Sequence, residues 1–498
     1  MITLVGPSLP YGFAKRHGVL LLDAGDVARV GLREGADPKG LIEARRVLGR
    51  PLAVEPLSQA AFDRQLSEIY AGDHLAAADG EDLDMPAGLD SLIDDIPAAA
   101  DLLDTADDAP VIRLINGIIA EAVRTGASDI HLETYESALL VRMRIDGVLR
   151  EALSLNPRIA PLLVSRIKVM ARLDIAEKRV PQDGRIPLAL GGKTLDVRVS
   201  TLPSRGGERV VMRILDKDQA GLTLDRLGMA PDALAAFRAA LAEPNGIILV
   251  TGPTGSGKTT SLYAGLALLN DQTRNILTVE DPVEYAIDGV GQTQVNTKVG
   301  MTFAAGLRAI LRQDPDVVMV GEIRDVETAA IAVQAALTGH LVLSTVHTND
   351  AAGAVTRLRD MGVEPFLLAS TLRLIVAQRL VRRLCEHCRT PEVADKKTAK
   401  LIGAKAGVTV WRPQGCSHCG GSGYIGRIGL YEVMKVGNRL RRLIAAEADE
   451  DALVAAAFDG AGTLGHRART LVLEGATSVE EAVRVARQET AADPAEAA

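Results

Sequence analysis

The stretch GIILVTGPTGSGKTT, residues 246–260, decides the fold. Its first part is a continuous apolar run of strand length, and its second part fits the phosphate-loop pattern completely. A helical segment, TSLYAGLALLN, follows directly, so the motif lies between the strand and the helix that a phosphate loop requires. Glycines let the backbone wrap around phosphate groups, and the start of a helix adds partial positive charge. The stretch therefore predicts a binding site for a nucleoside triphosphate.

The predicted nucleotide contacts all come from this loop: Gly252, Pro253, Thr254, Gly255, Ser256, Gly257, Lys258, Thr259 and Thr260. We expect Lys258 to bridge the β- and γ-phosphates of ATP, and the hydroxyl of Thr259 to bind Mg²⁺. A glycine-rich turn that binds nothing is the alternative interpretation. The residue types and the flanking elements both disfavour it.

Short apolar runs that alternate with helical segments surround the loop. The runs NILTVED, DVVMVGE and HLVLSTVHT follow GIILVTG in this order. Continuous apolar strands that alternate with helices are typical of a buried parallel sheet. The sequence therefore predicts an α/β fold, with a RecA-like P-loop ATPase domain in its second half.

Acidic residues follow two of these runs. Glu322 comes at the end of one strand, where a carboxylate can orient water or hold Mg²⁺ through water, and we expect it to polarise the attacking water. Glu280, Asp281 and Glu284 crowd together in TVEDPVEY. Three carboxylates so close repel one another unless a cation or an arginine lies near them, so we expect this acidic group to face a metal. A solvated strand-end carboxylate, or a solvated acidic turn, is the alternative.

Two histidines, His340 and His347, flank the run LVLSTV. A neutral imidazole can sense the γ-phosphate or relay its state to a neighbouring subunit, which makes both residues candidates for catalysis. A hydrogen-bonded position in the core or at an edge is an equally good interpretation of each histidine taken alone.

Composition narrows the class of protein. The formal net charge is −8 and aromatic residues make up 3% of the chain. A nucleic-acid coat usually needs a basic domain and base-stacking side chains, so no nucleic-acid partner is expected. No apolar run reaches the length of about 18 residues that a transmembrane helix needs, and the N-terminus lacks the order of a signal peptide. We therefore expect a cytoplasmic protein.

The four cysteines form two CxxC pairs and comprise Cys385, Cys388, Cys416 and Cys419. In a reducing cytosol this pattern favours a metal over disulfides. Two such pairs complete a tetrahedral Cys₄ shell with no open position, which is typical of a structural Zn²⁺ site. Chance spacing and redox use are the alternatives.

Changes in composition divide the chain into segments. They are an N-terminal α/β domain at 1–72, an acidic linker at 73–108, an α+β domain at 109–222, the P-loop domain at 223–491 with the zinc module at 385–425, and a disordered tail at 492–498. Three local signals are specific. Gly126 should end an apolar-faced helix, Asp146-Gly147 should form a hairpin turn, and Thr477 with Glu480 should form the capping box of the last helix.

At these motifs the sequence resembles the secretion-ATPase superfamily that also drives type IV pili. GPTGSGKTT, TVEDPVEY, VVMVGEIRD and TGHLVLSTVHTND occur in the order of the family and with roughly its spacing. The segments SDIHLE, RMRIDG, RVPQDGRI and STLPSRGGERVVMRIL are also similar, so the resemblance covers nearly the whole chain from about residue 110. LPYGFAKRHGVLL resembles the N-terminal domain of type II secretion ATPases, and the Cys₄ insert is frequent in export and pilus-extension relatives.

The resemblance implies a hexameric ATPase that hydrolyses ATP to power type II protein secretion through pseudopilus assembly. It implies that residues 1–72 bind the cytoplasmic domain of an inner-membrane platform protein and that 109–222 form a PAS-like domain. A polytopic platform protein of the inner membrane is a further implied partner. The protein would then be cytoplasmic and peripherally attached to the inner membrane through its partners.

The resemblance also implies roles for individual residues. Those already named match the nucleotide, acidic and histidine motifs of the family. Arg198 and Arg213 match arginines that reach the phosphates from the smaller domain, and Arg308 and Arg312 match further arginines near the nucleotide. A developing phosphoryl charge needs cations, and Lys258 alone supplies one. The alternative for each arginine is a surface or sheet-edge charge.

Three other functions remain open from the sequence. A pilus-extension ATPase of the same superfamily is the nearest alternative. A nucleic-acid translocase with the Cys₄ insert as a binding finger is disfavoured by the acidic charge and the few aromatic residues. A scaffold that binds nucleotide without hydrolysing it is disfavoured by the presence together of Lys258, Thr259 and Glu322.

Overall fold

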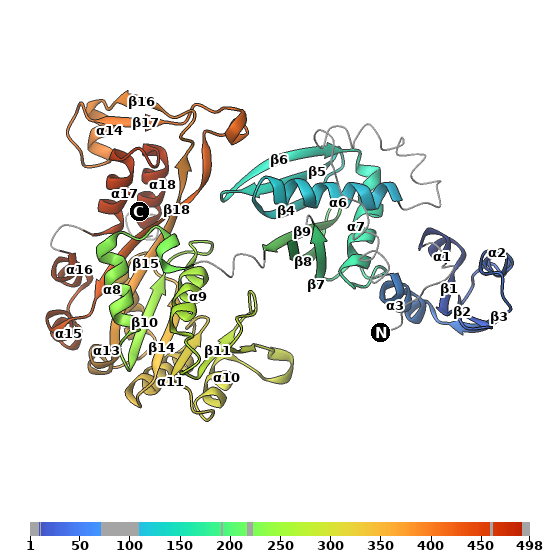
Figure 1. Cartoon of the computed structure of the whole chain (residues 1–498), viewed down its shortest axis with the longest axis horizontal. Helices are drawn as coiled ribbons and strands as arrows, with labels where there is room; N and C mark the ends of the chain where they lie inside the picture. Colours follow the sequence, from blue (N-terminus) through green and yellow to red (C-terminus); the bar gives the residue numbers. More distant parts are fainter. Residues whose placement is uncertain are drawn as a thin grey trace. The chain divides into compact units, whose positions relative to one another are not determined.

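The structure is a computed structural model and describes residues 9, 11–70, 109–190, 193–216, 223–458 and 462–490 (Figure 1). The chain divides into two units, Met1–Gln219 and Ala220–Ala498, and each is described by itself. Within these described ranges, no helix combines the length and the apolar character that crossing a membrane requires. The predicted acidic linker at 73–108 and the predicted tail at 492–498 lie outside the described residues.

The N-terminal part of the first unit is a small α/β arrangement. Its elements are α1 Tyr11–His17, β1 Val19–Asp23, β2 Ala28–Arg33, α2 Lys39–Leu48, β3 Leu52–Leu57 and α3 Gln59–Tyr70. The strands form a three-stranded sheet in the order β1-β2-β3. β1 pairs with β2 in antiparallel fashion, whereas β2 and β3 are parallel and need the crossover that α2 supplies.

The second part of the first unit is an α+β structure. Its elements are α6 Ala109–Arg124, β4 Ala127–Thr134, β5 Leu139–Ile145, β6 Val148–Leu155, η1 Pro157–Ile159, α7 Ala160–Met170, β7 Gln182–Leu190, β8 Lys193–Ser204 and β9 Gly207–Asp216. All neighbours in the six-stranded sheet, order β6-β5-β4-β9-β8-β7, are antiparallel. Asp146 and Gly147, with φ of 50° and 83°, form the predicted turn between β5 and β6. α6 buries Ile118 and Ile119 and ends just before Gly126, as predicted.

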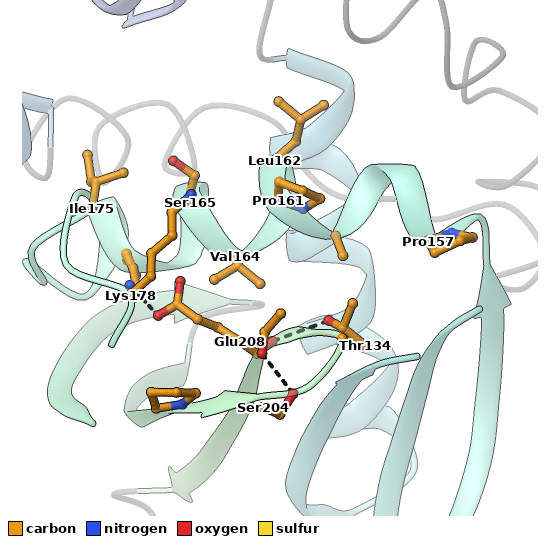
Figure 2. Close-up of a pocket in the computed structure, with 15 residues that line it drawn as sticks. Thr134, Pro157, Pro161, Leu162, Val164, Ser165, Ile175, Lys178, Ser204 and Glu208 are labelled. Atoms are coloured by element: carbon orange, nitrogen blue, oxygen red, sulfur yellow. Dashed lines mark hydrogen bonds and ion pairs between the residues drawn. The ribbon is translucent and has the colours of Figure 1, made fainter. Parts of the chain in front are cut away.

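A cavity of about 400 Å³ lies in this part of the first unit, between α7 and the hairpin of β8 and β9. Figure 2 shows Glu208 extending from β9 towards α7, with Val164 and Ser165 on the helix above it. Glu208 forms an ion pair with Lys168, which is fully buried and also donates to the main-chain oxygen of Glu177 at 2.7 Å. A buried ion pair therefore borders an otherwise largely apolar hollow.

The second unit contains a seven-stranded sheet in the order β12-β11-β13-β14-β10-β15-β18. Its strands are β10 Gly246–Thr251, β11 Ile276–Glu280, β12 Gly291–Gln294, β13 Val317–Val320, β14 Leu341–Val346, β15 Leu372–Leu384 and β18 Tyr424–Lys435. Every neighbouring pair is parallel except β15 with β18. β14 separates β10, which leads into the phosphate loop, from β13, which leads to Glu322. This order confirms the predicted α/β, RecA-like arrangement.

Helices cover both faces of this sheet (Figure 1). The remaining elements are η3 Leu224–Leu227, α8 Pro231–Leu241, α9 Lys258–Leu269, η4 Thr297–Val299, α10 Phe303–Ile310, α11 Val326–Leu337, α12 Ala351–Asp360, α13 Pro365–Thr371, β16 Thr390–Val393, α14 Lys396–Leu401, β17 Thr409–Arg412, η5 Ser417–Cys419, α15 Asn438–Ala445, α16 Glu450–Phe458, α17 Leu464–Leu473 and α18 Val479–Thr490. Ile247 and Leu249 of β10 pack with α10, α11 and α12, and Ile248 and Val250 pack with α8 and α9. Because β10 is buried on both sides, its sequence is continuously apolar.

The predicted capping box of the last helix is wrong by one residue. α18 begins at Val479, and Ser478 caps it by accepting a hydrogen bond from the N–H of Glu481 at 3.3 Å. The hydroxyl of Thr477 instead donates to the main-chain oxygen of Arg382 in β15 at 2.8 Å. A tertiary contact thus displaces the local pattern, because a neighbouring serine can take over the capping position.

Candidate nucleotide site and metal centre

The phosphate loop takes backbone conformations that glycine alone adopts easily. The φ angle is 146° at Gly252, 78° at Gly255 and 87° at Gly257. A Cβ atom at Gly252 would lie 2.4 Å from the main-chain oxygen of Gln378 and 2.6 Å from Oγ of Ser256. β15 therefore packs directly against the phosphate loop, and any side chain at Gly252 would force the strand and the loop apart.

Lys258 opens α9 and turns back onto its own loop. Its Nζ donates to the main-chain oxygens of Gly252 at 2.7 Å and Pro253 at 3.1 Å. The pKa of Lys258 is lowered to about 8, chiefly by burial and also by the nearby Arg379 cation, while the Glu322 carboxylate opposes both. Thr259, the next residue, lies in the first turn of α9. The loop thus holds an ammonium that can exchange its oxygen partners, beside a hydroxyl of the kind that binds Mg²⁺.

Glu322 lies just beyond β13, two strands away from the phosphate loop in the sheet. Its Oε2 is 3.1 Å from Nε2 of His347, and its Oε1 is 2.5 Å from Nη2 of Arg324. The side chain is 12% exposed, so both partners hold a largely buried carboxylate. The structure therefore brings Glu322 and His347 together beside Lys258, whose pKa the carboxylate raises.

The segment that carries His347 is fastened to the end of β10. The N–H of Thr348 donates to Oγ1 of Thr251 at 2.9 Å, and the two threonine hydroxyls are 2.7 Å apart. Asp350 then caps α12 by accepting from the N–H of Gly353 at 2.7 Å. These bonds fix the turn after β14 against the strand that leads into the phosphate loop.

His340 does not join this group within the chain. β10 and β14 are parallel, with Gly246 opposite Leu341, so His340 lies beside the start of β10 and roughly 20 Å from the phosphate end. Its Nδ1 is 2.9 Å from the main-chain oxygen of Ala335 and 3.2 Å from Oγ1 of Thr338. Within one chain, β14 places the two histidines at its opposite ends, and His340 has the hydrogen bonds of a residue at the edge of the strand.

Glu280 lies in a buried polar network. It is 3% exposed, and its carboxylate accepts hydrogen bonds from the hydroxyl of Tyr263, from Oγ1 of Thr278 at 2.6 Å and from Nε2 of Gln292 at 3.1 Å. The N–H of Glu284 donates to the Tyr263 hydroxyl at 3.3 Å. Hydroxyl and amide donors therefore hold the carboxylate of Glu280 in place.

Side-chain partners within their own units hold three of the predicted arginines, Arg213, Arg308 and Arg312. Arg308 pairs with Glu327 at 2.6 Å on the exposed side of α10, and Arg312 donates to the main-chain oxygen of Arg308 at 2.9 Å. Arg198 and Arg213 are register partners on β8 and β9. Nε of Arg213 donates to Oδ1 of Asp129 at 2.9 Å, while most of its side chain remains exposed. Like charges directly opposite each other are destabilising, so this pair favours a nearby anion.

The residues that hold the acidic groups in place were not predicted from the sequence. Arg324 follows Glu322 by two positions, and a charge so close in sequence was a usable signal. Tyr263 lies in the apolar run of α9 and contacts Glu280 only because the fold brings α9 beside β11, so no local pattern marks it.

The four cysteine thiols gather at one point. Sγ of Cys385 and Cys416 are 3.9 Å apart, Sγ of Cys388 and Cys419 are 3.9 Å apart, and all four lie within 4.8 Å of one another. Zinc–sulfur bonds of about 2.3 Å in a tetrahedron place the sulfurs roughly 3.8 Å apart, which is close to the spacing found. The N–H groups of Cys416 and Gly423 also donate to Sγ of Cys419, which favours its thiolate. The geometry fits a structural Zn²⁺.

The strand order and the phosphate loop define a P-loop ATPase of RecA-like fold. Residues 104–484 match the family described as Type II/IV secretion system protein, and residues 8–70 match the family of an N-terminal domain of GSPII protein E. The chain therefore belongs to the type II secretion ATPase family known as type II secretion system protein E.

Individual relatives agree with this assignment. The chain is 54% identical to the type II secretion system protein E of Klebsiella pneumoniae over 487 residues, 97% of each chain. It is 52% identical to the type II secretion system ATPase E of Vibrio cholerae over 489 residues, 96% of this chain and 97% of the relative. Both names refer to type II secretion, and the comparisons give the pilus-extension alternative no support.

Solved structures show the same fold. The pilus retraction motor PilT with bound ADP is 28% identical, with a TM-score of 0.51, over 74% of this chain and 95% of that one. The ATPase DotB of Legionella pneumophila is 22% identical, with a TM-score of 0.57, over 75% of this chain and 95% of that one. The described architecture is thus shared with ATPases of other machines.

Proposed function

We propose that the protein hydrolyses ATP to power type II protein secretion by driving pseudopilus assembly. One observation carries the proposal: a phosphate loop with a half-buried lysine lies beside a carboxylate that is held by a histidine and an arginine, in a chain whose full-length relatives are type II secretion ATPases. The likeness to a motor with bound ADP supports nucleotide binding at this loop.

The residues of the loop bind and orient the triphosphate. Main-chain N–H groups at the start of α9 surround the phosphates, and Lys258 exchanges the oxygens of Gly252 and Pro253 for phosphate oxygens. Mg²⁺, when bound at Thr259, neutralises charge on the β- and γ-phosphates. Because Lys258 already points at oxygen acceptors, little rearrangement of the loop is needed.

Glu322 orients the attacking water by accepting its hydrogen bond. To do so, one carboxylate oxygen exchanges Arg324 or His347 for the water, while the other keeps its partner. His347 thereby holds the carboxylate in line and reports whether it is engaged. Glu280 and Glu284 support the site through Tyr263, which stands on the helix that the loop begins.

Further assignments complete the proposal. Arg198, Arg213, Arg308 and Arg312 supply positive charge to the nucleotide in a homo-hexamer, and His340 contributes between subunits. The N-terminal domain binds the cytoplasmic domain of an inner-membrane platform protein, and a polytopic platform protein is a second partner. The four cysteines hold Zn²⁺. The protein works in the cytoplasm, on the inner membrane, and needs no nucleic acid.

Steady-state hydrolysis and ATP binding by the full-length protein test the catalytic assignment. Glu322→Gln should lower kcat at least about 100-fold while the Kd of ATP stays within about threefold, because the amide no longer activates water. Lys258→Ala should abolish ATP binding. Glu243→Gln, an exposed carboxylate before β10, is the matched control and should behave like the unmodified protein. Normal turnover by Glu322→Gln would refute the proposal.

A further inference from the structure

A buried arginine lies directly behind the phosphate loop. Arg379 is 2% exposed and belongs to β15, whose Ala377 is the register partner of Thr251 at the end of β10. Two residues further along β15, the chain passes the start of the loop. No motif in the sequence marks Arg379, and the catalytic roles described above make no use of it.

Arg379 packs against the first glycine of the loop. A Cβ atom placed on Gly252 would lie 3.2 Å from Nη1 of Arg379, so the guanidinium touches the backbone there. The preceding residue supports the other end of the loop, because Oε1 of Gln378 accepts from the hydroxyl of Ser261 in α9 at 2.7 Å. Residues 378 and 379 together back the loop at both of its ends.

The other nitrogen of the same guanidinium reaches the histidine segment. Nη2 of Arg379 donates to the main-chain oxygen of Asn349 at 2.7 Å and lies 3.2 Å from its Oδ1. Asn349 follows His347 by two residues, and His347 is the partner of Glu322. One buried side chain therefore touches both parts of the site, the loop that binds phosphate and the segment that orients the catalytic carboxylate.

The charge of Arg379 also acts on two titratable groups, Lys258 and Glu432. It lowers the pKa of Lys258, and it lowers the pKa of the buried Glu432, which burial raises. Glu432 accepts hydrogen bonds from the N–H groups of Ala351, at the start of α12, and Leu464, at the start of α17. A neutral replacement at position 379 would remove a cation from between these groups.

We propose that Arg379 is a positioning residue for ATP hydrolysis, which holds the phosphate loop in register with the pair formed by His347 and Glu322. The inference rests on the proposed function. Arg379 acts through its neighbours, because its side chain is buried behind the loop and two of its nitrogens contact main-chain oxygens.

The test compares Arg379→Met and Arg379→Lys with Arg382→Met in the full-length protein. Arg382 lies on the same strand and pairs with the buried Glu481 at 2.9 Å, so its loss removes the contacts of another largely buried arginine away from the loop. Arg379→Met should lower kcat about tenfold or more, with the KM of ATP changed by less than about threefold, because misplacement affects the reacting geometry more than binding. Arg379→Lys should recover part of the loss, since it keeps the charge and one contact. Arg382→Met should lower the melting temperature but leave kcat unchanged.

A double-mutant cycle gives a second readout. Arg379→Met combined with His347→Ala should be less than additive in kcat, because both changes disturb the same carboxylate. Full additivity would overturn the inference, as would a raised KM with unchanged kcat, which would make Arg379 a phosphate ligand. An equal loss of kcat in Arg382→Met would reduce Arg379 to a structural residue. Glu322→Gln separates the two claims: if it is inactive while Arg379→Met is fully active, only the positioning role of Arg379 fails.

Discussion

The protonation state of Lys258 should determine how ATP hydrolysis depends on pH. Its pKa of about 8 in the free protein means that the ammonium is lost as pH rises through this value. Bound triphosphate favours the charged form, so the loss affects capture of ATP more than turnover of bound ATP. We expect kcat/KM to fall above about pH 8, while kcat stays nearly flat to higher pH.

Profiles of kcat/KM and kcat against pH check this prediction. Lys258→Arg is the control, because a guanidinium keeps its charge throughout the range and should remove the alkaline decline. A decline in kcat/KM that begins only near the ordinary pKa of lysine, about 10.4, would contradict the assigned burial of Lys258.

The buried ion pair between Glu208 and Lys168, beside the cavity of the first unit, should contribute to the stability of this part. Glu208→Gln leaves the ammonium of Lys168 buried without a compensating charge. We expect the free energy of unfolding of this part to fall by about 3–5 kcal/mol, measured by urea unfolding. Glu136→Gln breaks the exposed pair with Arg205 and should cost less than about 1 kcal/mol. Equal effects of the two changes would show that the pair at Lys168 is hydrated.

At the residue scale, the sequence alone was enough to predict those parts of the site that consist of consecutive residues. The loop from Gly252 to Thr259 needs no partner to be recognised, because its chemistry lies in consecutive residues. Glu322 and His347 were proposed separately, and only the fold shows that they touch. Arg379 had no signal, because it lies in an apolar strand and its role depends on two segments that meet it in space.

The stability of the predicted zinc module should depend on its metal. Residues 385–423 connect the end of β15 to the start of β18, and the four thiols close this connection. Cys416→Ser should lower the zinc content from about one ion per chain to near zero, because a structural site needs all four ligands. The melting temperature of the ATPase domain should fall with it. Metal analysis and thermal unfolding measure both effects.

Ser417→Ala, a neighbour of the ligand, is the control and should keep its zinc. Unchanged melting after complete loss of the metal would show that the connection is held by other contacts. One such contact is the stacking of Arg389 on Trp411, with the guanidinium carbon 4.8 Å from the ring centre.

At the scale of elements, turns and helix ends were predicted correctly where one local pattern dominates, and incorrectly where two neighbouring residues can play the same role. The turn at Asp146-Gly147 was predictable because Asp-Gly favours the two-residue type I′ turn, in which both positions have positive φ. The start of α18 was misplaced because threonine and serine are adjacent there and both can cap. The antiparallel pairing of β18 with β15 was not anticipated, since pairing partners so far apart in sequence leave no local trace.

At the scale of the molecule, the second unit has hydrophobic cores of its own. The core of the α+β part contains residues 111–212, whereas the two cores on the faces of the large sheet contain residues 224–482. Residues 223–490 expressed alone should therefore fold and bind ATP. Their kcat should be lower than that of the whole protein, because Arg198 and Arg213 are missing.

Calorimetry and ATP turnover of this piece check the prediction, with Arg198→Ala in the full chain as the comparison. Loss of ATP binding by a folded piece would show that the first unit is needed to form the nucleotide site itself. Turnover equal to that of the full chain would remove both arginines from the mechanism.

The edge of the large sheet affects how readily the protein aggregates. An unpaired sheet edge offers free N–H and C=O groups to any chain that comes near, and a protein that gathers in assemblies meets its own copies often. One edge here is β12, only four residues long and polar in sequence, GQTQ. So short a strand offers few main-chain groups with which a strand of another copy could pair. Aggregation through this edge of the sheet is therefore disfavoured.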